Sequence, residues 1–345
     1  MHAPRREDVL ADWGRALERA GWPMRQLRAA LPELLTASGE LPGPGRRFWL
    51  SGLRRAWKAQ GWSLDAQGRR DLLALAAVWR DHPLALVLGD ELERRGELDA
   101  AAALGSIAAH HAQGDAEAAL TLAWRWQLLA PRDHRFAAAY RELSDWLAWR
   151  EGRPRFQADD LRLEPLGHQH LSDFAWQYHA ADIRELCRMP AFHDDARWHA
   201  WLDDLYRIGD EWCLAILHAD WGFVGCVHLV WAGNIGFLYY WLGPDFRGQG
   251  LARRAAELLL EGAAPSLRVC YAKVFERNAL SRRLLERLGF VELDIRAAPL
   301  DEEECFYRLG EPAPRARMVE ELHELMMRMH SDTRVAAPLM IGGGA

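Results

Sequence analysis

The stretch FRGQGLARRAAELLL, Phe246–Leu260, places two glycines one residue apart behind an arginine and then runs directly into a helical pattern. Gly248 and Gly250 carry no Cβ, so the backbone there can bend and approach a ligand closely. The first turn of the following helix offers unpaired N–H groups and the positive end of the helix dipole. Together these features predict a binding site for a phosphate or a pyrophosphate.

The residues before this loop predict the strand that leads into it. FLYYWLGPD, residues 237–245, is aromatic and apolar and stops at a Gly-Pro pair, which is typical of a strand ending in a turn. Two common phosphate motifs are excluded by spacing. A nucleotide P-loop needs GxxxxGK[ST] and a dinucleotide fold needs GxGxxG, whereas Leu-Ala-Arg follows Gly250.

A second informative stretch, LRVCYAKVFERNALSRRLLERLGFVEL, spans residues 267–293. Its apolar, β-branched run predicts a strand, and the leucines that follow Asn278 recur on one side of a predicted helix. Gly289 is expected to end that helix, and a new strand is expected at Phe290.

Both stretches resemble segments of the GNAT superfamily of N-acetyltransferases. The loop R-G-Q-G-L-A resembles the segment that holds the pyrophosphate of coenzyme A, and the strand, Asn-x-x-Ser, helix, Gly-Phe order resembles a later segment. DDLRLEPLGHQHLSDF, residues 159–174, resembles the opening of the RimJ/RimL-type branch. The resemblance covers about residues 158–310. It implies a mixed α/β domain with a splayed central sheet that transfers an acyl group from acetyl-CoA or a longer acyl-CoA to an amine.

The rest of the chain has a different pattern. Residues 1–150 read as helices, and RALERAGW (Arg15–Trp22) recurs as RAWKAQGW (Arg55–Trp62), which favours solenoid-like helical hairpins that are weakly tetratricopeptide-like. Glycines at 21, 61, 96 and 114 are the expected helix stops. We therefore predict four parts: a helical domain (1–150), a linker (151–160), a GNAT acyltransferase domain (161–310), and a C-terminal docking helix with a flexible tail (311–345).

Two roles remain open for the helical domain. Stacked helical hairpins commonly leave a concave surface that takes a peptide or a protein, so the domain could recruit the acceptor substrate. Alternatively, it only packs against the catalytic domain or mediates assembly into an oligomer. The sequence does not decide between the two.

Composition excludes several classes of protein. The formal net charge of −6 gives neither half of the chain the polycationic character of a nucleic-acid binder. The five cysteines form no CxxC pair, so neither a disulfide framework nor a metal site is expected. No run of about eighteen apolar residues predicts a membrane span, and no apolar core of a secretion signal follows the first residues. A cytoplasmic location is the simplest expectation.

The resemblance also implies which residues bind the co-substrate. The pantetheine arm would lie between the fourth and fifth strands of the family fold, and the diphosphate would lie on the loop that follows the fourth. Residues expected beside the arm are Trp241, Leu242 and Gly243; those on the diphosphate are Arg247, Gly248, Gln249, Gly250, Leu251 and Ala252. Asn278 and Ser281 are expected at the opposite wall.

The residues that handle protons are less clearly indicated. Where relatives carry a catalytic tyrosine this sequence has Leu285, and where the RimJ/RimL branch often has a glutamate it has Phe237. Ser281 is the remaining candidate to protonate the departing thiolate, although it could instead only cap a helix. For the base the sequence leaves three candidates, Tyr240, Glu276 and His228, each with an ordinary structural role as its alternative.

Three hypotheses of function follow. The first is an enzyme that acylates an amine of a peptide or protein held by the helical domain, with ribosomal-peptide tailoring as one setting for such chemistry. The second is acetylation of a small-molecule amine. The third is a binding protein that keeps the coenzyme site as a scaffold or sensor.

Overall fold

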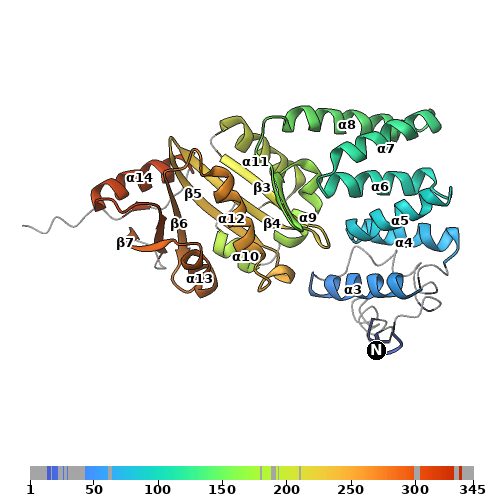
Figure 1. Ribbon diagram of the computed structural model, residues 1–345, viewed down its shortest axis with the longest axis horizontal. Helices are drawn as coiled ribbons and strands as arrows, with labels where there is room; N and C mark the ends of the chain where they lie inside the picture. The colour runs from blue at the N-terminus through green and yellow to red at the C-terminus, as the bar shows by residue number, and fades with distance from the viewer. Residues whose placement is uncertain are drawn as a thin grey trace, which may run out of the picture.

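The computed structural model describes residues 14–16, 18–21, 26, 29, 43–60, 64–178, 181–187, 192, 194–209, 211–298, 304–329 and 334–335. Figure 1 shows two parts side by side, a stack of helices and a sheet with helices on both of its faces. The predicted fold class, a helical region followed by a mixed α/β domain, is therefore confirmed.

Most helices of the stack begin at an aspartate cap. Its members are α3 (Gly43–Gln60), α4 (Ala66–Val78), α5 (His82–Arg94), α6 (Ala100–Ala112), α7 (Ala116–Leu129) and α8 (His134–Arg150). Each helix from α4 to α8 begins after an aspartate whose side chain accepts an N–H of the first turn: Asp65, Asp81, Asp99, Asp115 and Asp133. Such a cap stabilises a helix by about 1 kcal/mol, so the sequence starts each helix locally.

Glycines end two of these helices as predicted. Gly96 and Gly114, just after α5 and α6, have positive φ angles of 67° and 78°. Gly21 also has a positive φ, of 73°, whereas Gly61 lies outside the described residues. The left-handed conformation is unstrained only for glycine, so these positions let the chain turn directly into the next helix.

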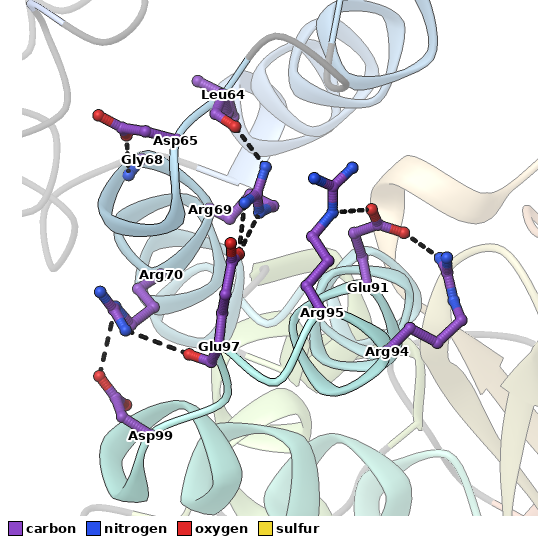
Figure 2. Close-up of polar contacts among 10 residues, drawn as sticks. All are labelled: Leu64, Asp65, Gly68, Arg69, Arg70, Glu91, Arg94, Arg95, Glu97 and Asp99. Carbon is purple, nitrogen blue, oxygen red and sulfur yellow. Dashed lines mark hydrogen bonds and ion pairs between the residues drawn. The ribbon is translucent and has the colours of Figure 1, made fainter.

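Ion pairs fasten the turn between α5 and α6 to helix α4, as Figure 2 shows. Arg69 of α4 is almost fully buried and donates both to the carboxylate of Glu97 and to the carbonyl of Leu64. Arg70 donates to the carbonyl of Glu97 at 3.1 Å. A buried guanidinium is tolerated only when its donors are paired, so these contacts specify one arrangement of the neighbouring helices.

The second part is built on a nine-stranded sheet. Its order is β1-β2-β3-β4-β5-β6-β8-β7-β9, and every neighbouring pair is antiparallel except β5 with β6. The strands are β1 (Phe156–Ala158), β2 (Leu161–Pro165), β3 (Glu211–His218), β4 (Gly222–Ala232), β5 (Ile235–Leu242), β6 (Val269–Phe275), β7 (Val291–Ala298), β8 (Glu304–Leu309) and β9 (Arg334–Val335). Strand β1 lies inside residues 151–160, the segment predicted as a linker, and pairs with β2.

Helices cover both faces of this sheet because its strands are apolar on both sides. Helices α12 (Leu251–Ala263) and α13 (Ala279–Arg287) lie on one face, where Leu238 and Leu259 share a core. The opposite face carries α9 (Leu171–Tyr178), α10 (Ala181–Cys187), α11 (Asp195–Ile208) and α14 (Arg315–Arg328). There Trp241 packs against α9, and Phe237 belongs to the core that α14 covers. No described helix has both the length and the apolar character needed to cross a membrane.

Buried polar contacts join the helical region to the sheet domain. His82 Nε2 of α5 lies 3.0 Å from Asp173 Oδ2 of α9, and both side chains are buried. Arg150, at the end of α8, lies 3.7 Å from Glu164 of β2, and these side chains are also buried. Since buried charges require their partners, we expect the two parts to behave as one body.

Candidate active site

The gap that the sequence predicts opens between β5 and β6. These parallel strands pair over four residues and separate after Leu238↔Ala272. Beyond that point β5 still pairs with β4 as far as Leu242, and β6 still pairs with β8 as far as Phe275. The two strands therefore splay apart while each remains held by its other neighbour, which leaves an opening in the middle of the sheet.

A cavity of about 1090 Å³ passes through this opening. It reaches both faces of the sheet, because it is lined by Tyr240, which faces α13, and by Tyr239, which faces the opposite side. Ten of the predicted site residues line it: Tyr240, Trp241, Leu242, Arg247, Gly248, Gly250, Leu251, Ala252, Asn278 and Ser281. The cavity is as large as the pockets that take whole cofactors or drug-sized ligands.

The predicted anion loop has the expected geometry at one end of the cavity. Gly248 and Gly250 have φ angles of 77° and 76°, and a Cβ added at either would meet only open space. Gly250 is the N-cap of α12, and it makes no side-chain cap bond there. The first N–H groups of α12 have no preceding helical turn to accept them, so a bound anion can accept them instead.

Positive side chains also line the cavity. Its lining includes Arg247 and Arg253 beside the glycine loop, and Arg283 and Arg287 one turn apart on α13. Guanidinium groups bind phosphate oxygens through charge-assisted hydrogen bonds. The glycine loop therefore suits a diphosphate by its backbone geometry, and Arg247 and Arg253 beside it suit the negative charge.

Asn278 and Ser281 have separate roles at the far wall. Asn278 is the N-cap of α13, and its Oδ1 accepts the backbone N–H of Ser281 at 3.2 Å. Helix α13 is therefore capped by the Asn278 side chain and not by the Ser281 hydroxyl. The Ser281 hydroxyl oxygen lies 2.6 Å from the hydroxyl oxygen of Tyr240, which comes from β5 across the gap.

The Tyr240 hydroxyl keeps its proton at neutral pH. Burial raises the pKa of Tyr240 to about 12, although the hydrogen bond with Ser281 works in the opposite direction. A protonated phenol that is hydrogen-bonded to a serine hydroxyl is a pair that can stabilise and protonate a thiolate.

Four predicted site residues do not line the cavity. Gly243 is buried beside it, and any side chain there would collide with Gln177. Gln249 and Glu276 are exposed. His228 is fully buried, at 0% exposure, so it cannot touch an acceptor directly.

Acidic and basic side chains on the opposite face of the gap were not among the residues predicted from the sequence. Glu211, Lys273 and Glu304 line the cavity there, and Tyr239 lies among them. Lys273 Nζ is 3.1 Å from Glu304 Oε1. The available signal was strand alternation, because the residue next to Tyr240 must face the other side of the sheet.

A match to a family of known proteins agrees with this geometry. Residues 160–291 match the model of the acetyltransferase (GNAT) domain. This part of the chain belongs to the GNAT acetyltransferase family. The match supports acyl-CoA:amine N-acyltransfer as the activity of this domain. No curated protein sequence matches the chain significantly.

Several solved structures of GNAT enzymes match part of this chain at low sequence identity and low TM-score. The spermidine N-acetyltransferase from Vibrio cholerae, in complex with CoA and spermine, is 16% identical, with 44% of this chain and 95% of that chain covered at a TM-score of 0.40. RimL, a ribosomal L7/L12 alpha-N-protein acetyltransferase, is 17% identical over 46% and 94% of the two chains, at 0.42. Mycobacterium smegmatis RimJ in complex with CoA-disulfide is 17% identical over 50% and 94%, at 0.39.

The Tyr240–Ser281 pair gives a first prediction. Tyr240→Phe should lower kcat about a hundredfold, because general acid catalysis contributes about 10²–10⁴ in rate. Ser281→Ala should lower kcat less, and the double variant should be no slower than Tyr240→Phe alone, since both changes break one proton donor. Thiol release from acetyl-CoA measures kcat, and calorimetry with coenzyme A controls for binding. Fully additive losses would mean that the two hydroxyls act independently.

Proposed function

We propose that the protein transfers an acetyl or longer acyl group from acyl-CoA to an amine of a peptide or protein, and that its helical region takes part in binding this acceptor. The observation that carries the proposal is the cavity through the sheet, whose lining includes the glycine loop and also side chains on the opposite face of the sheet. A co-substrate and an acceptor could then meet at the gap from opposite faces.

The residues at the gap can bind acyl-CoA and orient its thioester. The glycine loop would bind the diphosphate, and arginines that line the cavity would pair with its charge. The edge of β5 from Tyr239 to Leu242 has no ladder with β6, so its backbone can hydrogen-bond to an extended arm as a strand would. Bound acyl-CoA would supply the activated thioester, and the hydrogen-bonded pair of Tyr240 and Ser281 would give the leaving sulfur its proton.

A peptide or protein acceptor is favoured by the position of the helical region. That region contacts α9 through the buried His82–Asp173 pair, and α9 packs on the face where an acceptor would enter. Its helix α7 also presents exposed apolar side chains at Trp124, Leu128 and Leu129. Exposed apolar patches of this kind are typical of surfaces that bind protein.

A small-molecule amine is the second candidate, and a different observation favours it. Asp204, Glu211 and Glu304 all line the cavity on the acceptor side. Carboxylates in a partly buried cavity attract ammonium groups, so a compact polyamine is a reasonable alternative acceptor.

The proposal predicts which amines gain an acyl group. The full-length protein is incubated with acetyl-CoA, butyryl-CoA or octanoyl-CoA, together with a pool of short peptides, intact bacterial ribosomal proteins, or spermidine. Mass spectrometry should find acyl groups on peptide or protein amines. Acylation of spermidine alone would replace the proposed acceptor with a polyamine. Coenzyme binding without transfer to any amine would instead indicate the scaffold or sensor hypothesis.

A pair of surface variants tests the part taken by the helical region. Trp124→Ser combined with Leu128→Ser should raise KM for a protein acceptor several-fold and leave KM for acetyl-CoA unchanged. Val291→Ser is the control, because Val291 is similarly exposed but lies on the sheet domain. Equal effects of the two variants would count against recruitment through α7.

A further inference from the structure

Three strands bring a hydrogen-bonded cluster to the acceptor side of the cavity. Glu211 begins β3, His228 lies in the middle of β4, and Tyr239 lies on β5, all on the face opposite Tyr240 and Ser281. The Glu211 carboxylate is at the centre of this cluster. Its Oε1 lies 2.7 Å from His228 Nδ1 and also accepts the hydroxyl of Tyr239.

The cluster is held rigidly. The imidazole of His228 stacks on the ring of Tyr239, with the ring centres 4.2 Å apart, and its Nε2 lies 3.5 Å from the sulfur of Cys213. His228 and Cys213 are fully buried, whereas the Glu211 side chain is 20% exposed and lines the cavity together with Tyr239. Glu211 and Tyr239 are therefore the parts of the cluster that an acceptor can reach, and Glu211 is the one that carries a carboxylate.

Both partners of Glu211 act as hydrogen-bond donors. Burial alone would lower the pKa of His228, but the neighbouring Cys213 and Glu211 raise it above its ordinary value. Burial raises the pKa of Tyr239 well above its usual range, and the Glu211 charge adds to this effect. Both contacts use Oε1, so neither occupies the second carboxylate oxygen.

We propose that Glu211 is the residue that receives the acceptor's ammonium group and takes its proton, with His228 and Tyr239 as its positioning residues. This assignment rests on the proposed acyl transfer. Under this assignment the site has a carboxylate even though position 237 is a phenylalanine. The carboxylate comes from β3, two strands from β5, and the Tyr239 hydroxyl of β5 donates to it. It also gives the buried His228 a role that acts through Glu211 rather than by contact with the substrate.

The proton balance follows from the two faces of the gap. One proton of the ammonium moves to Glu211 and then to solvent, which frees the nitrogen lone pair to attack the thioester carbonyl. The C–N bond forms and the C–S bond breaks, while the sulfur takes a proton from the Tyr240–Ser281 pair on the other face. The second proton lost from nitrogen restores that pair.

Glu211→Gln tests the assignment, since it keeps the shape of the side chain and removes the charge. Two probe peptides are used with acetyl-CoA: one with a single lysine and a blocked N-terminus, and one with a free N-terminus and no lysine. At pH 7 the variant should lose about a hundredfold in kcat/KM on the lysine peptide. The loss should shrink as pH rises and be smaller on the free N-terminus, because a lysine amine has a pKa of about 10.4 and an α-amine about 8.

Companion variants separate positioning from folding. His228→Asn keeps a donor near the Nδ1 position and should retain most activity, whereas His228→Leu should shift the pH profile as Glu211→Gln does. Coenzyme A affinity of Glu211→Gln should equal that of the wild type, which shows that the variant still folds.

Each outcome decides something. A Glu211→Gln enzyme with the wild-type rate and pH profile would overturn the assignment and leave acyl transfer standing. Failure of the wild type to acylate either peptide or spermidine would overturn both the assignment and the proposed function.

Discussion

Gly250→Asp should abolish coenzyme A binding, while Gly250→Asn should bind within a few-fold of the wild type. Aspartate and asparagine have nearly the same shape, and both tolerate the left-handed conformation that Gly250 adopts at φ 76°. They differ by one negative charge, placed at the start of α12 where the diphosphate is expected. Two like charges about 4 Å apart near a protein surface repel by about 4 kcal/mol, so a loss of a hundredfold or more in affinity is expected.

Calorimetric titration with coenzyme A measures this effect. Gly233→Asp is the matched control, because Gly233 also has a positive φ with open space around it but lies in the turn between β4 and β5, outside the cavity. That variant should bind coenzyme A normally. If Gly250→Asp and Gly250→Asn bound coenzyme A equally well, the diphosphate could not lie at this loop.

Arg150→Ala is expected to give the largest loss of stability, about 3–5 kcal/mol in the free energy of unfolding. The Arg150 side chain is 3% exposed and lies 3.7 Å from Glu164, which is 1% exposed. Removing the guanidinium would leave the Glu164 carboxylate buried without this charge partner, and breaking a buried pair from one side costs about this much. The pair joins the end of α8 to β2, so the loss should be felt in both parts of the molecule.

Urea unfolding measures this loss. Glu117→Gln is the control: Glu117 also pairs with Arg150, but its side chain is 64% exposed, and exposed pairs contribute about 0–1 kcal/mol. Arg150→Met combined with Glu164→Leu removes both buried charges and should be more stable than Arg150→Ala. If Arg150→Ala cost no more than Glu117→Gln, the contact between α8 and β2 would not depend on this pair.

These contacts change how the helical region can be studied. Deleting residues 1–150 would remove Arg150 and His82, which lie beside the buried carboxylates Glu164 and Asp173. The shortened chain would expose surface around both carboxylates and remove Arg150 and His82 from beside them, so loss of activity could reflect a damaged sheet domain. Surface variants of α7 therefore test recruitment more directly than a deletion does.

The parts of the site that the sequence predicted are those built from consecutive residues. The glycine loop needs only two residues without side chains and the start of a helix, and all of these lie within Arg247–Leu251. The N-cap at Asn278 is equally local, since a cap contacts N–H groups two or three residues ahead. Because these features use short-range geometry, their pattern in the sequence indicated their structure.

Two of the three bases predicted from the sequence do not line the cavity. Glu276 follows β6 in the sequence but is exposed outside the cavity, and His228 is buried behind Glu211. Glu211 had no motif to mark it. It reaches Tyr239 only because β3 and β5 are the two neighbours of β4 in the sheet. This relation depends on strand order and register.

By itself, then, the sequence determined a glycine loop, the helix that follows it, the family that this segment matches, and a helical region ahead of it. Tertiary structure alone decided that Tyr240 meets Ser281, that Glu211 meets His228 and Tyr239, and that buried ion pairs hold the helical region against the sheet. The physical reason is how far apart in the sequence the interacting residues lie. Turns, caps and helix periodicity depend on neighbours within a few residues, whereas contacts across strands and between domains depend on which distant segments the whole fold packs together.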